Sequence, residues 1–183
     1  MQSPRFIFVV CMSILFCTMP IKYAFSQTDN DYDYQLSVDD QISVSIFNEP
    51  DLSIENVKIS TAGRISMPLI GQVNVKGLTV TALENELVRL YLKGYLKKPD
   101  VTVTITEYRP FYINGEVKQP GSYAYRKGLT VQKAVTLAGG FTERASTKSI
   151  SLKSEDEVKS KDSVFLTDAV KPGDILTIGT SFF

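Results

Sequence analysis

The most constraining stretch of this sequence is 115–121, Gly-Glu-Val-Lys-Gln-Pro-Gly, which is followed further along the chain by Ala138-Gly139-Gly140. Pro120-Gly121 fits a tight turn, because proline presets φ at its first central position and glycine accepts a positive φ at the second. The apolar runs on either side, 111–113 and 123–125, then read as strands. The pattern therefore predicts a β-hairpin around this turn.

A short helix is predicted directly after the hairpin. Gly128-Leu129-Thr130-Val131 opens it, with Thr130 as the N-cap, and Gly139-Gly140 ends it. Its buried face would consist of Val131, Ala134, Val135 and Ala138. A hairpin followed by a packed helix is typical of a binding or docking scaffold.

The first 26 residues predict a cleaved signal peptide. Arg5 precedes the uncharged apolar run 6–19, and Ala24-Phe25-Ser26 supply a peptidase site before Gln27. A permanent membrane anchor is the alternative, but the apolar run of about 14 residues is shorter than the roughly 20 that a spanning helix needs. We therefore expect export to the periplasm.

Composition bounds the mature chain further. Cys11 and Cys17 both lie inside the predicted signal, so we expect no disulfide, and the bulky residues before them, Val10 and Phe16, make lipidation unexpected. A hydrophobic content of 43% with 22% charged residues indicates a packed core. The formal net charge of zero offers no basic excess for binding nucleic acid.

A first β-rich module is predicted over 36–108, after a flexible lead-in at 27–35. The predicted elements are a strand with Ile42, Val44 and Ile46 on one face, a hairpin of 57–60 with 64–67, a strand at 72–75, a helix from Val80 to about Leu92, and a strand at 101–105. The helix has one apolar stripe, made of Val80, Leu83, Leu87 and Leu90. Its N-cap is either Thr79 or Thr81, the latter forming a capping box with Glu84.

The second predicted module, 109–183, ends in strands at 149–153, 164–166 and 174–178. A charged loop, 154–162, joins the first two of these strands. Its mixed charge favours a solvated hairpin tip, with an interaction role as the alternative.

Two internal echoes support a two-module α+β fold. Gly-Leu-Thr-Val occurs at 77–80 and again at 128–131. The segment 37–44 also resembles 171–178, with Asp40 aligned to Asp174. We therefore expect two small β-rich modules, each with one packed helix, and a boundary near 107–110.

The chemistry that the chain lacks excludes several functions. It contains no histidine, and no cysteine after residue 17, which excludes His-based triads, Cys nucleophiles and nearly every zinc or copper site. No phosphate-binding glycine loop is present. The carboxylate pairs that remain for glycoside cleavage are Asp39/Asp40, Glu49/Asp51 and Glu84/Glu86. We expect structural roles for all three pairs, and no catalytic, cofactor or metal site.

Longer segments carry a family resemblance. LSVDDQISVSIFNEPDL (36–52), KISTAGRISMPLIGQVNVKGL (58–78) and PDVTVTITEY (99–108) resemble the periplasmic part of the Wza-like bacterial polysaccharide export proteins. The segment 112–145 resembles an SLBB domain, a β-grasp module proposed to bind soluble ligands. Together the matches cover essentially the whole mature chain.

The resemblance implies a non-enzymatic, ring-forming homo-oligomer in the periplasm, associated with the outer membrane, through which an exopolysaccharide or capsule chain passes. It also implies an inner-membrane polysaccharide co-polymerase as a docking partner. Longer members cross the outer membrane with a C-terminal amphipathic helix that is not seen here. A separate outer-membrane barrel protein is therefore the hypothesis for the pore.

Contacts to the glycan remain open at this stage. Tyr112, Tyr123 and Tyr125 either stack on sugars or belong to the core or an interface. Arg126 and Lys127 either contact acidic sugars or contact a neighbouring subunit. The alternative functions are a periplasmic glycan-binding or sensing module that forms no channel, and a carboxylate-based glycan hydrolase.

Overall fold

The computed structural model describes residues 34–154, 160–162 and 164–181. The predicted signal peptide, most of the predicted lead-in, the centre of the charged loop and the terminal Phe182-Phe183 lie outside the described residues. The described part has two hydrophobic cores, one built by residues from Leu36 to Val103 and the other by residues from Phe111 to Ile178. The α+β fold class predicted from the sequence is confirmed, since each core has its own helix and its own β-strands.

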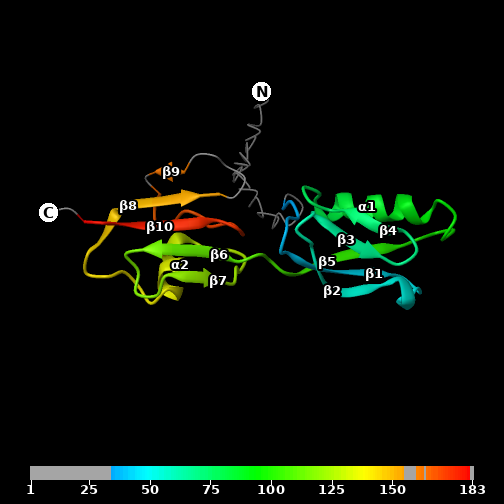
Figure 1. The fold of residues 1–183 in the computed structure, drawn as a ribbon, viewed down its shortest axis with the longest axis horizontal. Coiled ribbons are helices and arrows are strands. Elements are labelled where there is room, and N and C mark those ends of the chain that lie inside the picture. The colour runs from blue at the N-terminus through cyan, green and yellow to red at the C-terminus, as the bar shows by residue number, and fades with distance from the viewer. Residues whose placement is uncertain (1–33, 155–159, 163, 182–183) are drawn as a thin grey trace, which may run out of the picture. The chain divides into compact units, whose positions relative to one another are not determined.

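A three-stranded antiparallel sheet with the order β2-β1-β5 forms the base of the first module (Figure 1). The strands are β1 (Gln41–Ile46), β2 (Ile54–Lys58) and β5 (Val101–Glu107). Ile42, Val44 and Ile46 are buried, as their two-residue alternation predicts. The short 3₁₀ helix η2 (Pro50–Leu52) connects β1 to β2.

The predicted hairpin between 57–60 and 64–67 is wrong. A turn does form, since Gly63 N–H donates to the Ser60 carbonyl at 2.8 Å. However, β2 pairs with β1, whereas β3 (Arg64–Met67) pairs with β4 (Gly71–Asn74) in a separate two-stranded sheet. The sequence predicts only a break at 68–71, and in the structure this break is the turn of the true hairpin.

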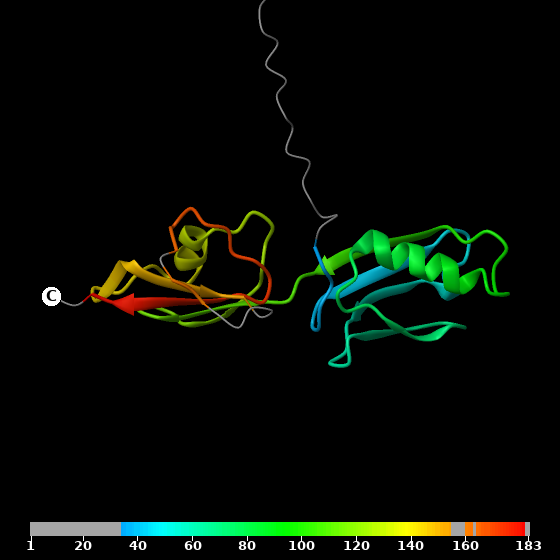
Figure 2. The same ribbon diagram turned by 90° about the horizontal axis from the view of Figure 1, so that it is seen from above.

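Helix α1 (Val80–Tyr91) covers one face of the three-stranded sheet (Figure 2). Thr79 is its N-cap, because the Thr79 hydroxyl accepts a hydrogen bond from Ala82 N–H at 3.2 Å. The alternative capping box is wrong, since the Glu84 carboxylate instead accepts from Val103 N–H of β5 at 2.9 Å. Leu83 and Leu87 are buried as predicted, and Tyr91 completes the buried face that the sequence analysis left incomplete.

The second module is a five-stranded sheet with the order β7-β6-β10-β8-β9 (Figure 1). The strands are β6 (Phe111–Gly115), β7 (Gly121–Tyr123), β8 (Ala145–Lys153), β9 (Lys161–Asp162) and β10 (Ile175–Thr180). The central pair, β6 and β10, is parallel, and helix α2 (Val131–Leu137) lies on one face of the sheet (Figure 2). This arrangement is consistent with the predicted β-grasp module.

The hairpin predicted around 115–121 is present, but its geometry differs from the prediction. β6 pairs with β7, with Phe111 opposite Tyr123. The positive φ lies at Gly115, at 83°, and not at Gly121, which opens β7. Glycine is required at 115 for a second reason, because a Cβ there would collide with the Ile178 carbonyl oxygen of β10.

The two glycine-containing segments that open the sequence analysis meet in the structure. Lys118 N–H donates to the Gly140 carbonyl at 3.0 Å, and Gln119 N–H donates to the Ala138 carbonyl at 2.9 Å. The hairpin loop thus supplies donors for carbonyl groups at the C-terminal end of α2, which a helix leaves without intrahelical partners. This contact fixes the end of the helix against the sheet.

Helix α2 follows its sequence prediction closely, whereas one strand does not. The Thr130 hydroxyl accepts from Lys133 N–H, and the four predicted apolar residues are all buried. The strand predicted at 164–166 is wrong. Val164 is buried outside any strand, and the short strand lies earlier, at β9, inside the segment expected to be a loop.

Candidate functional site

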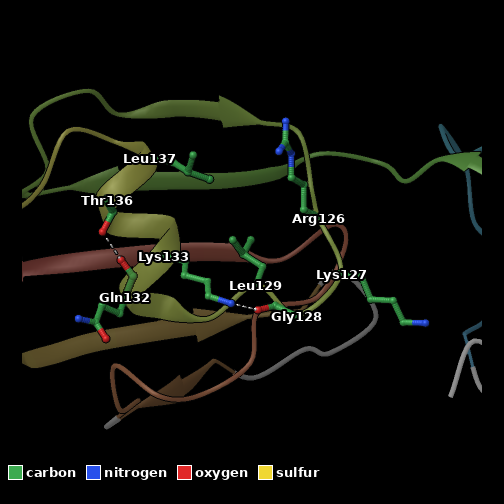
Figure 3. A pocket seen from close by; sticks show the side chains of 8 residues that line it. All are labelled: Arg126, Lys127, Gly128, Leu129, Gln132, Lys133, Thr136 and Leu137. Atoms are coloured by element: carbon green, nitrogen blue, oxygen red, sulfur yellow. Dashed lines mark hydrogen bonds between the residues drawn. The ribbon is translucent and has the colours of Figure 1, made fainter. Parts of the chain in front are cut away.

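A hollow lies beside helix α2 in the second module (Figure 3). Its volume of about 560 Å³ falls within the range typical of small-molecule sites. The residues that line it come from the loop after β7 and from the outer face of α2: Arg126, Lys127, Gly128, Leu129, Gln132, Lys133, Thr136 and Leu137. We call this hollow the α2 pocket.

Apolar side chains form the wall of the α2 pocket. Leu129 is buried against the second core, and Leu137 is 50% exposed although it is a large apolar residue. Figure 3 shows both leucines facing the same hollow from opposite ends of the helix. A concave apolar wall of this kind favours a ligand with an apolar face of its own.

Three cations surround this wall, and no carboxylate lines the pocket among the residues that the structure describes. Lys133 Nζ donates to the Gly128 carbonyl at 2.8 Å, which fixes the ammonium at the edge of the hollow and leaves two of its three donors for other acceptors. Arg126 stands at the opposite edge (Figure 3). The pocket therefore has an apolar wall and a positively charged rim.

Asp168, an acidic residue of the loop that contacts the start of α2, is paired with a lysine. The Asp168 backbone carbonyl accepts from Val131 N–H at the start of α2, but its carboxylate pairs with Lys161 at 2.9 Å. The hydrogen bond from Lys161, followed by that from Phe165 N–H, lowers the pKa of Asp168. This carboxylate is thus engaged with its own loop.

Of the lining residues, only Arg126 and Lys127 are contact candidates on sequence grounds. Lys133 and Leu137 lie four residues apart on the exposed face of α2, and this helical spacing is the signal that could have added them. Leu137 lies outside the buried stripe of α2, and an apolar residue on the exposed face of a helix is a signal of a contact surface.

The three tyrosines named from the sequence have different environments. Tyr123 stacks on Phe111 with ring centroids 5.8 Å apart, and its hydroxyl donates to the Gln119 carbonyl. Tyr125 is half-buried and lies edge-on to Tyr108 at 5.3 Å. Tyr112 is 45% exposed. The three do not form one platform, and none of them lines the α2 pocket.

Asp40, a candidate carboxylate, is fully buried in a hydrogen-bond network. It accepts from Ser37 N–H and Arg109 N–H, each at 2.8 Å, and from the Tyr34 hydroxyl at 2.7 Å. The Arg109 guanidinium lies 3.7 Å away. With this many donors Asp40 is a structural acceptor, and its neighbour Asp39 points outward to Lys58 at 2.9 Å.

Tyr34 is perturbed by this network. Burial, and then the charge and hydrogen bond of Asp40, raise the pKa of the Tyr34 phenol above its ordinary value. Its ring lies edge-on to Tyr108 at 5.0 Å. The phenol therefore stays protonated and donates to Asp40 throughout the neutral range.

The other two carboxylate pairs do not form an acid–base site either. The Glu84 carboxylate accepts from Val103 N–H of β5. Glu86 pairs with Arg89 on the same helix, which lowers the pKa of Glu86. Asp51 is exposed in η2, and Glu49 precedes that helix. Both glutamates of α1 are half-exposed.

A metal site and a membrane-spanning helix are both absent from the described ranges. No cluster of three or more potential metal ligands occurs among those residues. None of the helices there combines the length and the apolar character needed to span a bilayer.

Comparison with known proteins gives two family matches in consecutive order. Residues 28–106 match the family model for polysaccharide biosynthesis/export proteins, and residues 110–160 match the SLBB domain. The exopolysaccharide production protein ExoF of Rhizobium meliloti (strain 1021) is 38% identical over 85 residues. That match covers 45% of this chain and only 20% of the length of the relative.

Proposed function

Because the chain belongs to the polysaccharide biosynthesis/export family and carries an SLBB domain, we propose that it is a non-enzymatic component of an exopolysaccharide or capsule export machine. The observation that carries this proposal is the pair of matches, which fall in order on the two hydrophobic cores. Neither core presents an evident catalytic constellation among the described side chains.

The proposed mechanism is geometric. Several copies of the chain close into a ring through head-to-tail contacts, and the ring passes a hydrated glycan without binding it tightly. Large exposed apolar side chains support self-association, since such residues often mark contact surfaces. Phe47 at the end of β1 and Phe165 before β10 are 70% and 72% exposed.

The proposed location is the periplasm, reached through a cleaved signal peptide and followed by association with the outer membrane. An inner-membrane polysaccharide co-polymerase would deliver the polymer. A separate outer-membrane barrel protein would complete the path.

The second candidate function is a periplasmic glycan-binding or sensing module that forms no channel, and the α2 pocket favours it. The native mass of the mature protein, measured in detergent with and without the co-polymerase, separates the two. A closed oligomer supports the export ring. A strict monomer in both conditions that binds oligosaccharide at one site supports the sensor.

A carboxylate-based hydrolase has little support from the geometry. Glycoside cleavage needs two carboxyl groups facing each other across a cleft. Here Asp40 is buried, Glu84 accepts from Val103 N–H, and Glu86 is paired with Arg89. Incubation of the purified protein with its polymer should release no reducing ends. Release that disappears when Glu49 and Asp51 are changed to Gln and Asn would contradict the proposal.

A further inference from the structure

We propose that the α2 pocket binds an anionic sugar residue, through the cations of its rim and the leucines of its wall. This inference deepens the proposed function, on which it rests, by naming the chemical class of glycan that the SLBB domain contacts. It also decides between the two roles left open for Arg126 and Lys127 in favour of acidic sugars.

The first argument is charge. Among the described residues, Arg126 and Lys133 line the pocket and no carboxylate does, so these two charges attract an anion. Among the described residues, none accepts a hydrogen bond or forms an ion pair with the Arg126 guanidinium. The acceptor for Lys133 Nζ is the neutral Gly128 carbonyl. Within the described ranges, neither of these two cations has a carboxylate as its partner.

The second argument is shape. The hollow has a volume of about 560 Å³, within the range of small-molecule sites, and is lined by eight residues, whereas a protein–protein interface involves roughly 20–30 residues on each side. An acidic protein segment is therefore a poorer match than a compact ligand. A sugar ring that carries a carboxylate offers both a C–H face for Leu129 and Leu137 and a charged group for Lys133.

The third argument is the presence of polar groups beside the apolar wall and the charged rim. Gln132 and Thr136 lie on the same helix face, and the Thr136 hydroxyl donates to the Gln132 carbonyl at 2.8 Å (Figure 3). The Gln132 side-chain amide is exposed and lines the hollow. It offers both donors and an acceptor for sugar hydroxyl groups.

The test is titration calorimetry on the mature full-length protein with three probes. The probes are a linear oligoglucuronate, a neutral gluco-oligosaccharide of the same length, and free glucuronic acid. We expect the acidic oligosaccharide to bind and the neutral one not to bind. We also expect the affinity to fall as salt rises, because the rim is exposed. Binding of the free acid as tightly as the oligomer supports the site and assigns its ligand to a soluble sugar.

Matched variants locate the binding. Lys133→Gln and Arg126→Gln should each weaken binding by roughly tenfold, since each removes a charged hydrogen-bond donor. Leu137→Ala, at an exposed position, should weaken it without unfolding the protein. Lys98→Gln, which removes an exposed charge in the first module, should change nothing. Thermal unfolding curves of the variants check that each remains folded.

Several results would overturn the inference. These are equal affinity for the acidic and neutral oligosaccharides, no detectable binding, no effect of the pocket variants, or tighter binding of an oligoglutamate peptide than of any sugar. The outcome is separable from that of the proposed function. If deleting the chain blocks polysaccharide secretion while the pocket binds no sugar, the pocket inference fails alone. If the pocket binds as expected while secretion is unchanged by deletion, the export function fails alone.

Discussion

Asp40 and Asp174 close the same turn in the two modules. Each carboxylate accepts a hydrogen bond at 2.8 Å from the backbone N–H three residues earlier, that of Ser37 or Lys171. In each turn the residue just before the aspartate has a positive φ, 72° at Asp39 and 83° at Gly173. Both turns lead directly into a core strand, β1 or β10.

The resemblance extends to the segment that precedes each helix. Leu36 N–H donates to the Leu78 carbonyl at 2.9 Å, and Val170 N–H donates to the Leu129 carbonyl at 3.0 Å. Leu78 and Leu129 are the second residues of the two Gly-Leu-Thr-Val segments. In both modules the segment that leads into the aspartate turn is therefore hydrogen-bonded to the Gly-Leu-Thr-Val segment. The order along the chain differs, since the aspartate precedes the helix in the first module and follows it in the second.

Replacing these aspartates should destabilise the two modules unequally. Asp40→Ala removes the counter-ion of the buried Arg109 guanidinium and the acceptor for the backbone N–H groups of Ser37 and Arg109, so we expect a loss of about 3–5 kcal/mol in the free energy of unfolding. Asp174→Ala removes acceptors for Lys171 N–H and the Ser154 hydroxyl but no ion pair, and should cost about 1.5–3 kcal/mol. Urea unfolding followed by circular dichroism measures both, and equal losses would contradict this account.

Tyr34 should make the protein sensitive to alkali. Its pKa is higher in the folded than in the unfolded chain, where tyrosine titrates near 10. The stabilisation is thus complete below about pH 10 and is lost as pH rises further, because only the unfolded state releases the proton. The slope is at most about 1.4 kcal/mol per pH unit for one proton.

The variant Tyr34→Phe tests this assignment. It should be less stable than the parent at pH 8 by about 1–3 kcal/mol, the cost of a lost hydrogen bond to a buried carboxylate. Its free energy of unfolding should then fall less steeply than that of the parent between pH 10 and pH 11. Tyr112→Phe, at an exposed position, serves as the control and should keep the parental slope. Identical slopes for all three proteins would refute the role of Tyr34.

Gly115 should tolerate no side chain. Gly115→Ala combines the strain of a positive φ with a collision against the Ile178 carbonyl, which must push β6 from β10. Gly140→Ala is the matched control, since its φ is 91° but a Cβ there meets nothing within 4 Å. We expect about 1–2 kcal/mol for the control from strain alone, and a further loss of roughly 1–3 kcal/mol at Gly115 from the collision. Comparable thermal unfolding midpoints would show that the two strands are not so close.

The two threonine N-caps provide a more modest test. Thr79→Ala and Thr130→Ala should each cost about 1 kcal/mol, since each removes the acceptor for one N–H in the first turn of its helix. Thr81→Ala should cost less than either, because Thr81 is exposed within α1 and caps nothing. A larger loss at Thr81 than at Thr79 would restore the capping box that the structure rejects.

Local patterns in the sequence predicted the elements whose residues fix their own boundaries. Helix α2 begins at a threonine cap, ends at two glycines and buries one stripe, so all of its signals agree. Strand pairing needed more than local pattern. The turn between Ser60 and Gly63 forms as predicted. The strands before and after it pair with β1 and β4 and not with each other, because pairing depends on which neighbouring strand buries the apolar face.

The candidate site was likewise predicted only in part from local sequence. Arg126 and Lys127 attracted attention as adjacent cations in a loop. The hollow forms because that loop lies beside the outer face of α2 in the folded chain. Residue spacing in the sequence does not predict this proximity. Leu129 is buried against the core and also walls the pocket, so a core pattern concealed its second role.

Polysaccharide location in cells that lack this chain tests the central claim most directly. A labelled sugar precursor would be supplied to the deletion strain, to the same strain complemented with the full chain, and to the parent, and polymer would then be quantified in the periplasm and in the medium. The account predicts that polymer disappears from the medium of the deletion strain, is retained within the envelope, and returns to the medium on complementation. Unchanged secretion in the deletion strain would contradict it.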